Sequence, residues 1–382
     1  MDTFSFSIPQ NIVFGKGSLK KLPELAKNLQ KKKAFIISGP HLNKIGMVDK
    51  CKEALKAAGM DSDSFTETEG NPSTDTVEKS TEKFKVSGAD FIVAIGGGSP
   101  LDVAKAVAVL ATFGGKITDY EGGGKVNGPV VPMIAIPTTA GTGSEVTAFS
   151  VITDHSRNYK LTVVSNYLLP AYAILDPELI TSVPVKTAAA CGVDAMVHAL
   201  EAYISLAASP FSDMFALKAL ELIGANIRGY VANRRSEKAS EAMLLGSLFA
   251  GIAFSHARLG DVHAMSHPIS AFFDVPHGIA NAILLPTIVE YNALADTGKY
   301  YDIYENICKC PVDREIFSSD MLAAELTELN SEIGIPASLK DVGVKEDKFE
   351  AMAEDAMKSG NIAVNPRSTT KDDVISLYNK AF

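Results

Sequence analysis

Cysteine and positive charge are both scarce in this chain of 382 residues. Its four cysteines are too few for a disulfide framework, and they form no paired Cys-x-x-Cys metal motif. The formal net charge is −9, whereas nucleic acids and anionic membrane surfaces attract clustered positive charge. The sequence therefore predicts a protein of the reducing cytoplasm that binds small molecules, with no nucleic-acid or membrane partner.

The sequence also lacks an evident targeting or membrane segment. The first ten residues, MDTFSFSIPQ, carry an acid at the second position and no basic region, which argues against a secretory signal. We find no apolar run long enough to cross a bilayer. A hydrophobic content of 46% and a charged content of 21% are typical of a globular protein, and the length favours two domains.

Short apolar runs alternate with helical patterns in the first half of the chain. Three runs have strand length and end in breakers: KAFIISGP, ADFIVAIGGGS and VPMIAIPTTAGTGS. Between the first two lies a helical pattern that Ser73 or Thr74 would cap at its start and Gly88 at its end. Repeated strand and helix units predict an α/β domain with a mostly parallel sheet, over residues 1–180.

Strand patterns stop after about residue 180. Three long segments rich in Ala, Leu and Met have apolar residues at helical spacing: VKTAAACGVDAMVHALEAYIS, FSDMFALKALELIGANIRGYVANRR and EKASEAMLLGSLFAGIAFSHARL. They predict an all-helical domain over residues 181–382. Because no Ser/Gly-rich linker separates the halves, we expect the two domains to pack tightly with a cleft between them.

Two loops rich in glycine or threonine follow predicted strands. GGGSPLDVAK joins a strand to a helix, where free backbone N–H groups and the helix dipole favour a phosphate. It departs from the G-x-G-x-x-G fingerprint, since Leu101 takes the place of the third glycine, and by itself a plain tight turn is an equal alternative. PTTAGTGSEVT would lie at the same edge of the sheet, so the pair favours a nucleotide. EGGGKVNGP follows no strand and indicates a surface turn.

Four of the seven histidines gather between residues 256 and 277. Asp194 and His198 are four apart on a predicted helix, as are His263 and His267, so each pair shares a helix face. His277 would lie about 21 Å from His263 along an unbroken helix. The prolines at positions 268 and 276 can break that path and return the chain.

Two interpretations of these residues remain open. Each histidine could serve in the core or as a cap. Imidazoles and a carboxylate at paired helical spacings also suit a divalent transition metal such as Fe²⁺ or Zn²⁺. The pattern lacks the Glu of His-Glu-x-x-His, so it does not predict a zinc peptidase.

Four motifs in order carry a family resemblance: GGGSPLDVAKA, IPTTAGTGSEVT, GVDAMVHALEAY and VHAMSHPISAFFDVPHGIANAILLP. Together they resemble the iron-dependent, or group III, alcohol dehydrogenases, a family that includes lactaldehyde reductase and propanediol dehydrogenase. The resemblance covers essentially the whole chain. It implies a dinucleotide-binding domain followed by a helical metal domain, with hydride passing between a nicotinamide cofactor and an alcohol or aldehyde whose oxygen the metal polarises.

The resemblance also implies roles for individual residues. The implied metal ligands are Asp194, His198, His263 and His277, and His267 would be a non-ligand catalytic histidine that relays a proton. The implied cofactor contacts are Gly39, Asn71, Gly97, Gly98, Ser99, Asp102, Thr138, Thr139, Thr142, Thr147, Phe149, Lys160 and Leu179. The cofactors would be NAD(H) or NADP(H) with Fe²⁺, or Zn²⁺, in a homodimer or larger homo-oligomer.

Two departures from the family pattern bear on specificity. Many relatives that use NAD carry Asp where this chain has Gly39, so its absence leaves NADP(H) open. The segment before His263 is more polar than in several relatives, which suggests a substrate with a second polar or anionic group. We expect residues 254–263 to form one helix, which places His256 on the stripe of His263 and makes Phe254 and His256 candidate substrate contacts.

Two other functions compete with the oxidoreductase. A metal-dependent lyase of the dehydroquinate synthase type would share the fold, but it would need Lys and Arg residues around its pocket that the helical half does not show near the ligands. A silent nucleotide-binding protein would have no reason to fill all four ligand positions.

Overall fold

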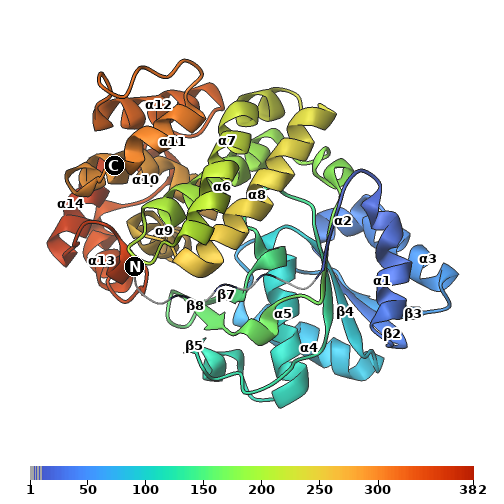
Figure 1. The fold of residues 1–382 in the computed structure, drawn as a ribbon. Coiled ribbons are helices and arrows are strands. Elements are labelled where there is room, and N and C mark those ends of the chain that lie inside the picture. Colours follow the sequence, from blue (N-terminus) through green and yellow to red (C-terminus); the bar gives the residue numbers. More distant parts are fainter. Residues whose placement is uncertain (1–3, 5, 7, 9–10) are drawn as a thin grey trace. The chain divides into compact units, whose positions relative to one another are not determined.

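A computed structural model of the chain describes residues 4, 6, 8 and 11–382 (Figure 1). The chain divides into two compact units. We call residues 8–139 and 144–180 the sheet unit, and residues 181–382 with residues 4, 6 and 140–143 the helical unit. The expectation that the first ten residues are not a targeting signal concerns positions that lie mostly outside the described residues.

Within the described residues, six strands form the main sheet of the sheet unit. Their spatial order is β1 (Ile12–Phe14), β9 (Tyr172–Leu175), β6 (Met133–Pro137), β4 (Phe91–Gly96), β2 (Lys33–Ile37) and β3 (Asp61–Phe65). Every neighbouring pair is parallel. The parallel sheet predicted from the alternation of strand and helix patterns is confirmed.

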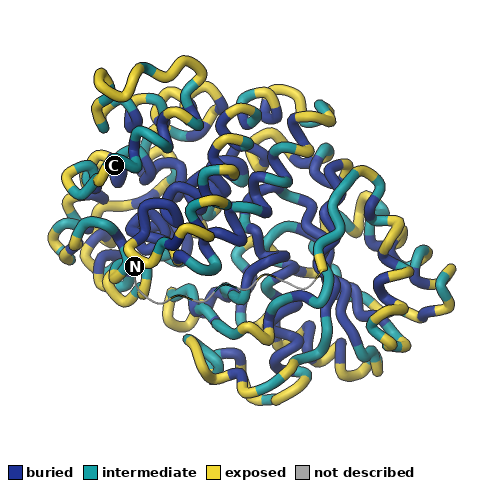
Figure 2. The backbone as a smooth tube through the Cα atoms, viewed as in Figure 1, coloured by how far each residue is buried: buried dark blue, intermediate teal, exposed yellow. Residues whose placement is uncertain are grey.

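Helices cover both faces of this sheet. They are α1 (Leu22–Asn28), α2 (Pro40–Lys44), α3 (Met47–Ala57), α4 (Thr74–Ser87) and α5 (Gly98–Phe113). Alternate residues of one strand enter different cores: Ala34 and Ile36 join the core of α1 and α3, whereas Phe35 and Ile37 join that of α4 and α5. The inner strands β2, β4 and β6 are therefore nearly continuous apolar runs, because neither of their faces meets water (Figure 2).

Local signals place the ends of α4 as predicted. Ser73 Oγ accepts a hydrogen bond from the backbone N–H of Thr76 at 3.2 Å, and Gly88 ends the helix in the left-handed conformation with φ 67°.

The expectation that EGGGKVNGP forms only a surface turn is partly wrong. Gly122–Gly123 form the short strand β5, which pairs with β8 (Tyr159–Val164) in a small sheet that also holds β7 (Phe149–Asp154).

The helical unit contains only helices among its described regular elements. In chain order they are α6 (Val185–Ile204), α7 (Pro210–Ala232), α8 (Glu237–Ala257), α9 (Asp261–Phe273), α10 (His277–Asn292), α11 (Lys299–Ile307), α12 (Ser319–Glu332), α13 (Phe349–Ala356) and α14 (Lys371–Ala381). Helix α6 packs against α7, α8 and α10, and nearly all of its residues are buried. A helix enclosed in this way is apolar all round, which leaves its few polar residues as candidates for a buried site.

The single helix expected over residues 254–263 is wrong. Helix α8 ends at Ala257, and Arg258 takes a left-handed φ of 64°. Helix α9 then begins at Asp261 in a direction bent by 104°. Hence His256 and His263 share no helical stripe, and the geometric reason for pairing them is lost.

The segment between His263 and His277 turns back towards α9 as expected, but only one of its two prolines breaks the helix. Pro268 lies inside α9 and does not end it. The chain turns at Asp274, whose φ is 54°, and at Pro276, which precedes α10. One of the two expected proline breaks is therefore present.

Among the described residues, one helix reaches the length and mean hydropathy that could cross a membrane, although it is not an uninterrupted apolar run. It covers His277–Ala295, and half of it is buried inside the chain. It packs against α6, α9, α12 and α14 and carries His277 and Asn281. These are also properties of a core helix, and length and composition alone are weak evidence for a membrane span.

Candidate metal centre and cofactor loops

Three helices of the helical unit bring one carboxylate and three imidazoles together. Asp194 and His198 lie one turn apart on α6, His263 is on α9, and His277 is the first residue of α10. Asp194 Oδ1 lies 3.9 Å from His198 Nε2, 3.8 Å from His263 Nε2 and 3.8 Å from His277 Nε2. The paired helical spacings thus produce a real cluster. Its side chains are buried, apart from His277, which is 23% exposed.

The opposite ring nitrogen of each of these histidines is also engaged. The partners of Nδ1 are Gly141 O at 3.3 Å for His198, Glu201 Oε2 at 2.5 Å for His263, and Ser266 Oγ at 3.5 Å for His277. Such contacts fix the ring orientation and direct Nε2 to the cluster. The three Nε2 atoms thus all lie within 3.9 Å of Asp194 Oδ1.

The donor set fits a divalent transition metal. Ligand atoms about 2.0–2.2 Å from an ion lie roughly 3–4 Å from one another, as Asp194 Oδ1 and the imidazole nitrogens do. The atoms of Asp194, His263 and His277 all lie within 4.8 Å of one another. His198 is outside that set of three, and its Nε2 approaches the cluster at Asp194 Oδ1. Imidazole and carboxylate suit Fe²⁺ and Zn²⁺ alike.

Glu201 is a functional candidate that our sequence reasoning missed. It lies on α6 with a side chain 2% exposed, accepts the Val262 backbone N–H at 2.7 Å, and faces His263 Nδ1. Burial raises the pKa of Glu201 to about 7, and the backbone hydrogen bonds act against that rise. A signal was present, since Glu201 follows Asp194 by seven residues, two helical turns.

The remaining predicted residues of the helical unit have different surroundings. The ring of His267 lies 5.2 Å from that of His277 and 6.2 Å from that of His263. Phe254 stacks on His198 with ring centroids 4.4 Å apart. His256 instead packs on Phe6 at 4.2 Å, and its Nδ1 lies 2.9 Å from Ile252 O. Phe254 and His267 therefore border the cluster, whereas the contacts of His256 involve other parts of the unit.

In the sheet unit, the two glycine and threonine loops lie side by side. β4 and β6 are neighbours with Gly96 opposite Pro137, and the Thr138 N–H donates to Gly96 O at 2.8 Å. Gly97 caps α5, so Gly98 and Ser99 form its first turn. A Cβ on Gly97 would lie 3.3 Å from Thr139 Oγ1, which explains why glycine fits there. The predicted placement of both loops at one sheet edge is confirmed.

A buried lysine connects these loops to β7. Lys105 Nζ donates to Ser144 Oγ at 2.9 Å, Thr147 Oγ1 at 3.1 Å and Phe149 O at 2.7 Å. Asp102 accepts from Ser144 Oγ at 2.6 Å, so its carboxylate faces the same segment. Lys105 is a second residue that sequence reasoning missed. Its hydrogen bonds hold the end of the threonine loop and the start of β7 against α5.

Burial shifts the ionisation of these side chains. It lowers the pKa of Lys105 to about 8 and raises that of Asp102, and the attraction between the two charges opposes both shifts. Burial also raises the pKa of Glu145, on the short helix Ser144–Val146, to about 7. Among the described residues, Glu145 Oε1 has no hydrogen-bond partner.

Other predicted cofactor residues are spread through both units. Lys160 Nζ donates to Asn71 Oδ1 at 2.9 Å, which brings two of them together. Gly39 lies two residues after the end of β2 and is the N-cap of α2. Leu179 lies in the core of α1 and α3, and Thr142 belongs to the segment 140–143 of the helical unit.

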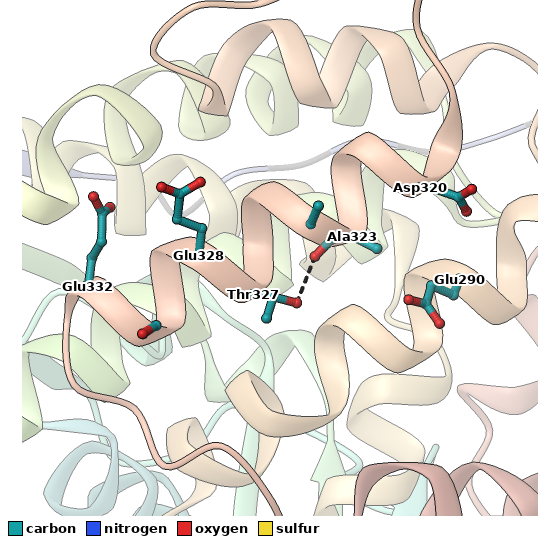
Figure 3. Close-up of a pocket in the computed structure, with 8 residues that line it drawn as sticks. Glu290, Asp320, Ala323, Thr327, Glu328 and Glu332 are labelled. Carbon is teal, nitrogen blue, oxygen red and sulfur yellow. Dashed lines mark hydrogen bonds between the residues drawn. The ribbon is translucent and has the colours of Figure 1, made fainter.

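A hollow also lies away from the cluster and the loops. A cavity of about 590 Å³ is lined by one face of α12 and by Glu290 of α10. Figure 3 shows its acidic side chains, with Thr327 Oγ1 donating to Ala323 O. Glu332 pairs with Arg228 and Lys309, and Glu290 pairs with Lys380. Two of its four carboxylates are thus already paired with basic side chains, and within the described residues the group of His, Cys, Asp and Glu side chains placed to hold an ion is that of Asp194, His263 and His277.

Comparison with known proteins places this geometry in a family. Residues 9–177 match the family model for iron-containing alcohol dehydrogenase, and residues 188–382 match the C-terminal model of the Fe-containing alcohol dehydrogenase family. The chain belongs to the iron-containing alcohol dehydrogenases. The predicted family and fold are confirmed, and the activity class is that of a metal-dependent alcohol and aldehyde oxidoreductase.

Several relatives match along almost their full length. The 1,3-propanediol dehydrogenase of Citrobacter freundii is 39% identical over 99% of both chains, and the lactaldehyde reductase of Escherichia coli is 37% identical over 97% of both. The NAD-dependent methanol dehydrogenase of Bacillus methanolicus is 36% identical over 99% of both. A crystal structure of a 1,3-propanediol oxidoreductase is 38% identical, covers 100% of both chains and has a TM-score of 0.95. None of these relatives is a lyase.

Proposed function

We propose that this chain interconverts a small primary alcohol and its aldehyde, using NAD(H) and an Fe²⁺ ion held by Asp194, His198, His263 and His277. The observation that carries the proposal is the convergence of three imidazole Nε2 atoms within 3.9 Å of Asp194 Oδ1. Zn²⁺ is the second candidate, since the same ligands accept it and it ordinarily binds more tightly than Fe²⁺. In this proposal residues 1–180 bind the nucleotide and residues 181–382 hold the metal.

The chemistry follows from the groups around the cluster. When bound, the ion would supply Lewis acidity at the oxygen of the alcohol or aldehyde, and the nicotinamide cofactor would supply or accept the hydride. His267 is the proton carrier in the proposal, because its ring is beside His277 and is only partly buried. Phe254 excludes water from the side of His198 on which it stacks.

The cofactor assignment rests on the sheet unit. The free backbone N–H groups of Gly97, Gly98 and Ser99 at the start of α5 suit a pyrophosphate. Thr138 and Thr139 lie beside that turn, and Lys105 holds Thr147 and Phe149 in place. NAD(H) is the proposed cofactor, in keeping with the relative named as NAD-dependent, while the lack of a carboxylate at Gly39 leaves NADP(H) as the alternative.

We infer a small substrate with a second polar or anionic group. Relatives named for 1,3-propanediol and lactaldehyde support that class, since each name denotes a short chain with two oxygens. Phe254 is the proposed contact with the carbon chain. The expected setting is the cytoplasm and the expected assembly a homodimer or larger homo-oligomer, with no nucleic-acid or membrane partner.

Metal reconstitution tests this proposal. The purified chain is stripped with a chelator, reloaded anaerobically with Fe²⁺ or Zn²⁺, and assayed by NADH and NADPH consumption with lactaldehyde, 3-hydroxypropanal and propanal. We expect turnover only after reloading, with NADH preferred and the two hydroxyaldehydes reduced more efficiently than propanal. Equal turnover by the stripped and the reloaded chain would contradict the role of the metal.

A further inference from the structure

Lys105 is a lysine of α5 whose exposed fraction is 0%. All three N–H groups of its ammonium are used, because Nζ donates to Ser144 Oγ, Thr147 Oγ1 and Phe149 O. These acceptors follow one another along the chain, from the threonine loop to the first residue of β7. One side chain therefore fastens the whole of residues 144–149 to α5.

A second attachment of the same segment lies one turn earlier on α5. Asp102 Oδ1 accepts from Ser144 Oγ at 2.6 Å, and Asp102 Oδ2 accepts from the Val151 N–H at 3.1 Å. The same helix begins with residues 97–99, the turn that the proposed function assigns to the pyrophosphate. Helix α5 thus joins the pyrophosphate turn to the segment by side-chain bonds.

The order of the strands indicates which part of a dinucleotide this segment would meet. In the sheet, β4 lies between β2 and β6. The pyrophosphate turn follows β4, and Gly39, which we relate to the 2′-position of the adenosine ribose, follows β2. The nicotinamide half then falls on the side of β6, and the short helix Ser144–Val146 packs against α5 and β6. Residues 144–149 therefore border the nicotinamide half.

The role of Lys105 in this arrangement is indirect. A side chain without exposed surface cannot reach a bound ligand, so Lys105 can act on the cofactor only through residues 144–149. A buried ammonium is stable only where its donors are satisfied and an opposite charge is near, here Asp102 Oδ1 at 3.9 Å. Any other course of the segment would leave buried N–H groups without acceptors, which gives the observed course a strong preference.

We propose that Lys105 is a positioning residue for the nicotinamide half of the cofactor. It holds residues 144–149 in the course that receives this half before the cofactor binds, so that binding does not have to order them. The inference rests on the proposed binding of NAD(H) and deepens it, since Lys105 is not among the implied cofactor contacts.

The test compares NADH with ADP-ribose, which has the adenosine and pyrophosphate parts of the cofactor but no nicotinamide. Titration calorimetry on the purified full-length chain measures the affinity of both. Lys105→Met keeps an unbranched apolar side chain and removes the charge and the donors. The matched control is Lys33→Met: Lys33 also lies in the sheet unit, donates to Ser87 O at 2.8 Å and pairs with Asp63, at the opposite end of β2 from Gly39.

We expect Lys105→Met to weaken NADH binding about tenfold, because NADH must then order residues 144–149 itself, and to change ADP-ribose binding less than about twofold. Lys33→Met should change neither affinity. Thermal unfolding verifies that each variant is folded. A folded Lys105→Met in which both affinities fall by the same factor, or neither falls, would overturn the inference, since a merely structural role leaves their ratio unchanged.

If Lys105→Met does not fold, Ser144→Ala decides. It removes one acceptor of the Lys105 ammonium and should weaken NADH binding by a smaller factor, again without an effect on ADP-ribose. An unchanged ratio of the two affinities in Ser144→Ala would then overturn the inference.

The wild type separates this inference from the proposed function. A wild-type chain that binds NADH no more tightly than ADP-ribose would overturn the positioning role and leave the nucleotide site standing. A wild-type chain that binds neither would overturn both the positioning role and the proposed cofactor.

Discussion

Glu201 and His263 form a buried carboxylate–imidazole pair at the cluster, with Oε2 2.5 Å from Nδ1. Their side chains are 2% and 1% exposed, and the second carboxylate oxygen accepts the Val262 N–H. The Glu201 side chain on α6 thus binds the first turn of α9 and also orients the His263 ring. A carboxylate in this position also increases the basicity of Nε2, the nitrogen that the proposal assigns to the metal.

Replacing Glu201 by Gln should weaken metal binding by about 10–100-fold, because the ring loses its anionic acceptor. The measurement is metal retained during dialysis against graded chelator. Glu221→Gln is the control, since Glu221 is an exposed residue of α7 paired with Lys218. Equal retention by the two variants would refute the positioning role of Glu201.

His256→Ala should lower stability by about 1 kcal/mol, because the ring loses its contact with Phe6. It should reduce kcat/KM for propanal and lactaldehyde by the same factor, since α8 ends before the segment that carries His263. Thermal unfolding and steady-state kinetics provide the two readouts. A loss confined to lactaldehyde would restore the hypothesis that His256 contacts the substrate.

Glu145 should make the stability of the chain depend on pH. Its pKa is raised to about 7 from an ordinary 4.5, so the unfolded chain releases this proton at a lower pH than the folded chain does. The stability that Glu145 contributes is therefore present below pH 4.5 and lost as the pH rises through 7, by up to about 3 kcal/mol.

Urea unfolding of the wild type and Glu145→Gln across this pH range measures the effect. The variant does not titrate at this position, so the difference between the two free energies of unfolding isolates Glu145. We expect the wild type to lose stability relative to the variant as the pH rises. A difference that does not change with pH would show that Glu145 ionises normally in the folded chain.

Gly39→Asp should lower the ratio of kcat/KM with NADPH to kcat/KM with NADH. The cause is repulsion between the new carboxylate and the 2′-phosphate, worth about 1–3 kcal/mol. A Cβ at this position would lie 3.1 Å from Thr68 O, so the substitution also has a steric effect. Gly39→Ala separates the two causes. If the Ala variant changes the ratio as much as the Asp variant does, charge is not responsible.

Patterns of nearest neighbours along the chain predicted most of the fold. Apolar runs marked β2, β4 and β6, and the cap residues Ser73 and Gly88 marked the ends of α4, because strand length and capping are local properties. Helical spacing likewise predicted that Asp194 and His198 lie one turn apart on the same face of α6.

Contacts between distant segments account for what the sequence did not reveal. The break after Ala257 is one example: a Cβ on Gly260 would lie 3.0 Å from Glu201 Oε1 and 2.9 Å from Asn365 Oδ1, so residues far along the chain require a glycine there. Lys105, Glu201 and Asn281 were missed for the same reason. Glu201 does lie two helical turns after Asp194, but the position of each of the three becomes informative only through partners on other elements.

The metal content of the wild type and of His277→Ala tests the central claim most directly. His277 contributes one imidazole at the partly exposed side of the cluster, so its loss should remove the ion while the buried core keeps the fold. Elemental analysis of the purified proteins, with circular dichroism as the check on folding, should find one iron per wild-type chain and almost none in a folded, inactive His277→Ala. A His277→Ala chain that retains its full metal content, or an active wild type without metal, would contradict the account.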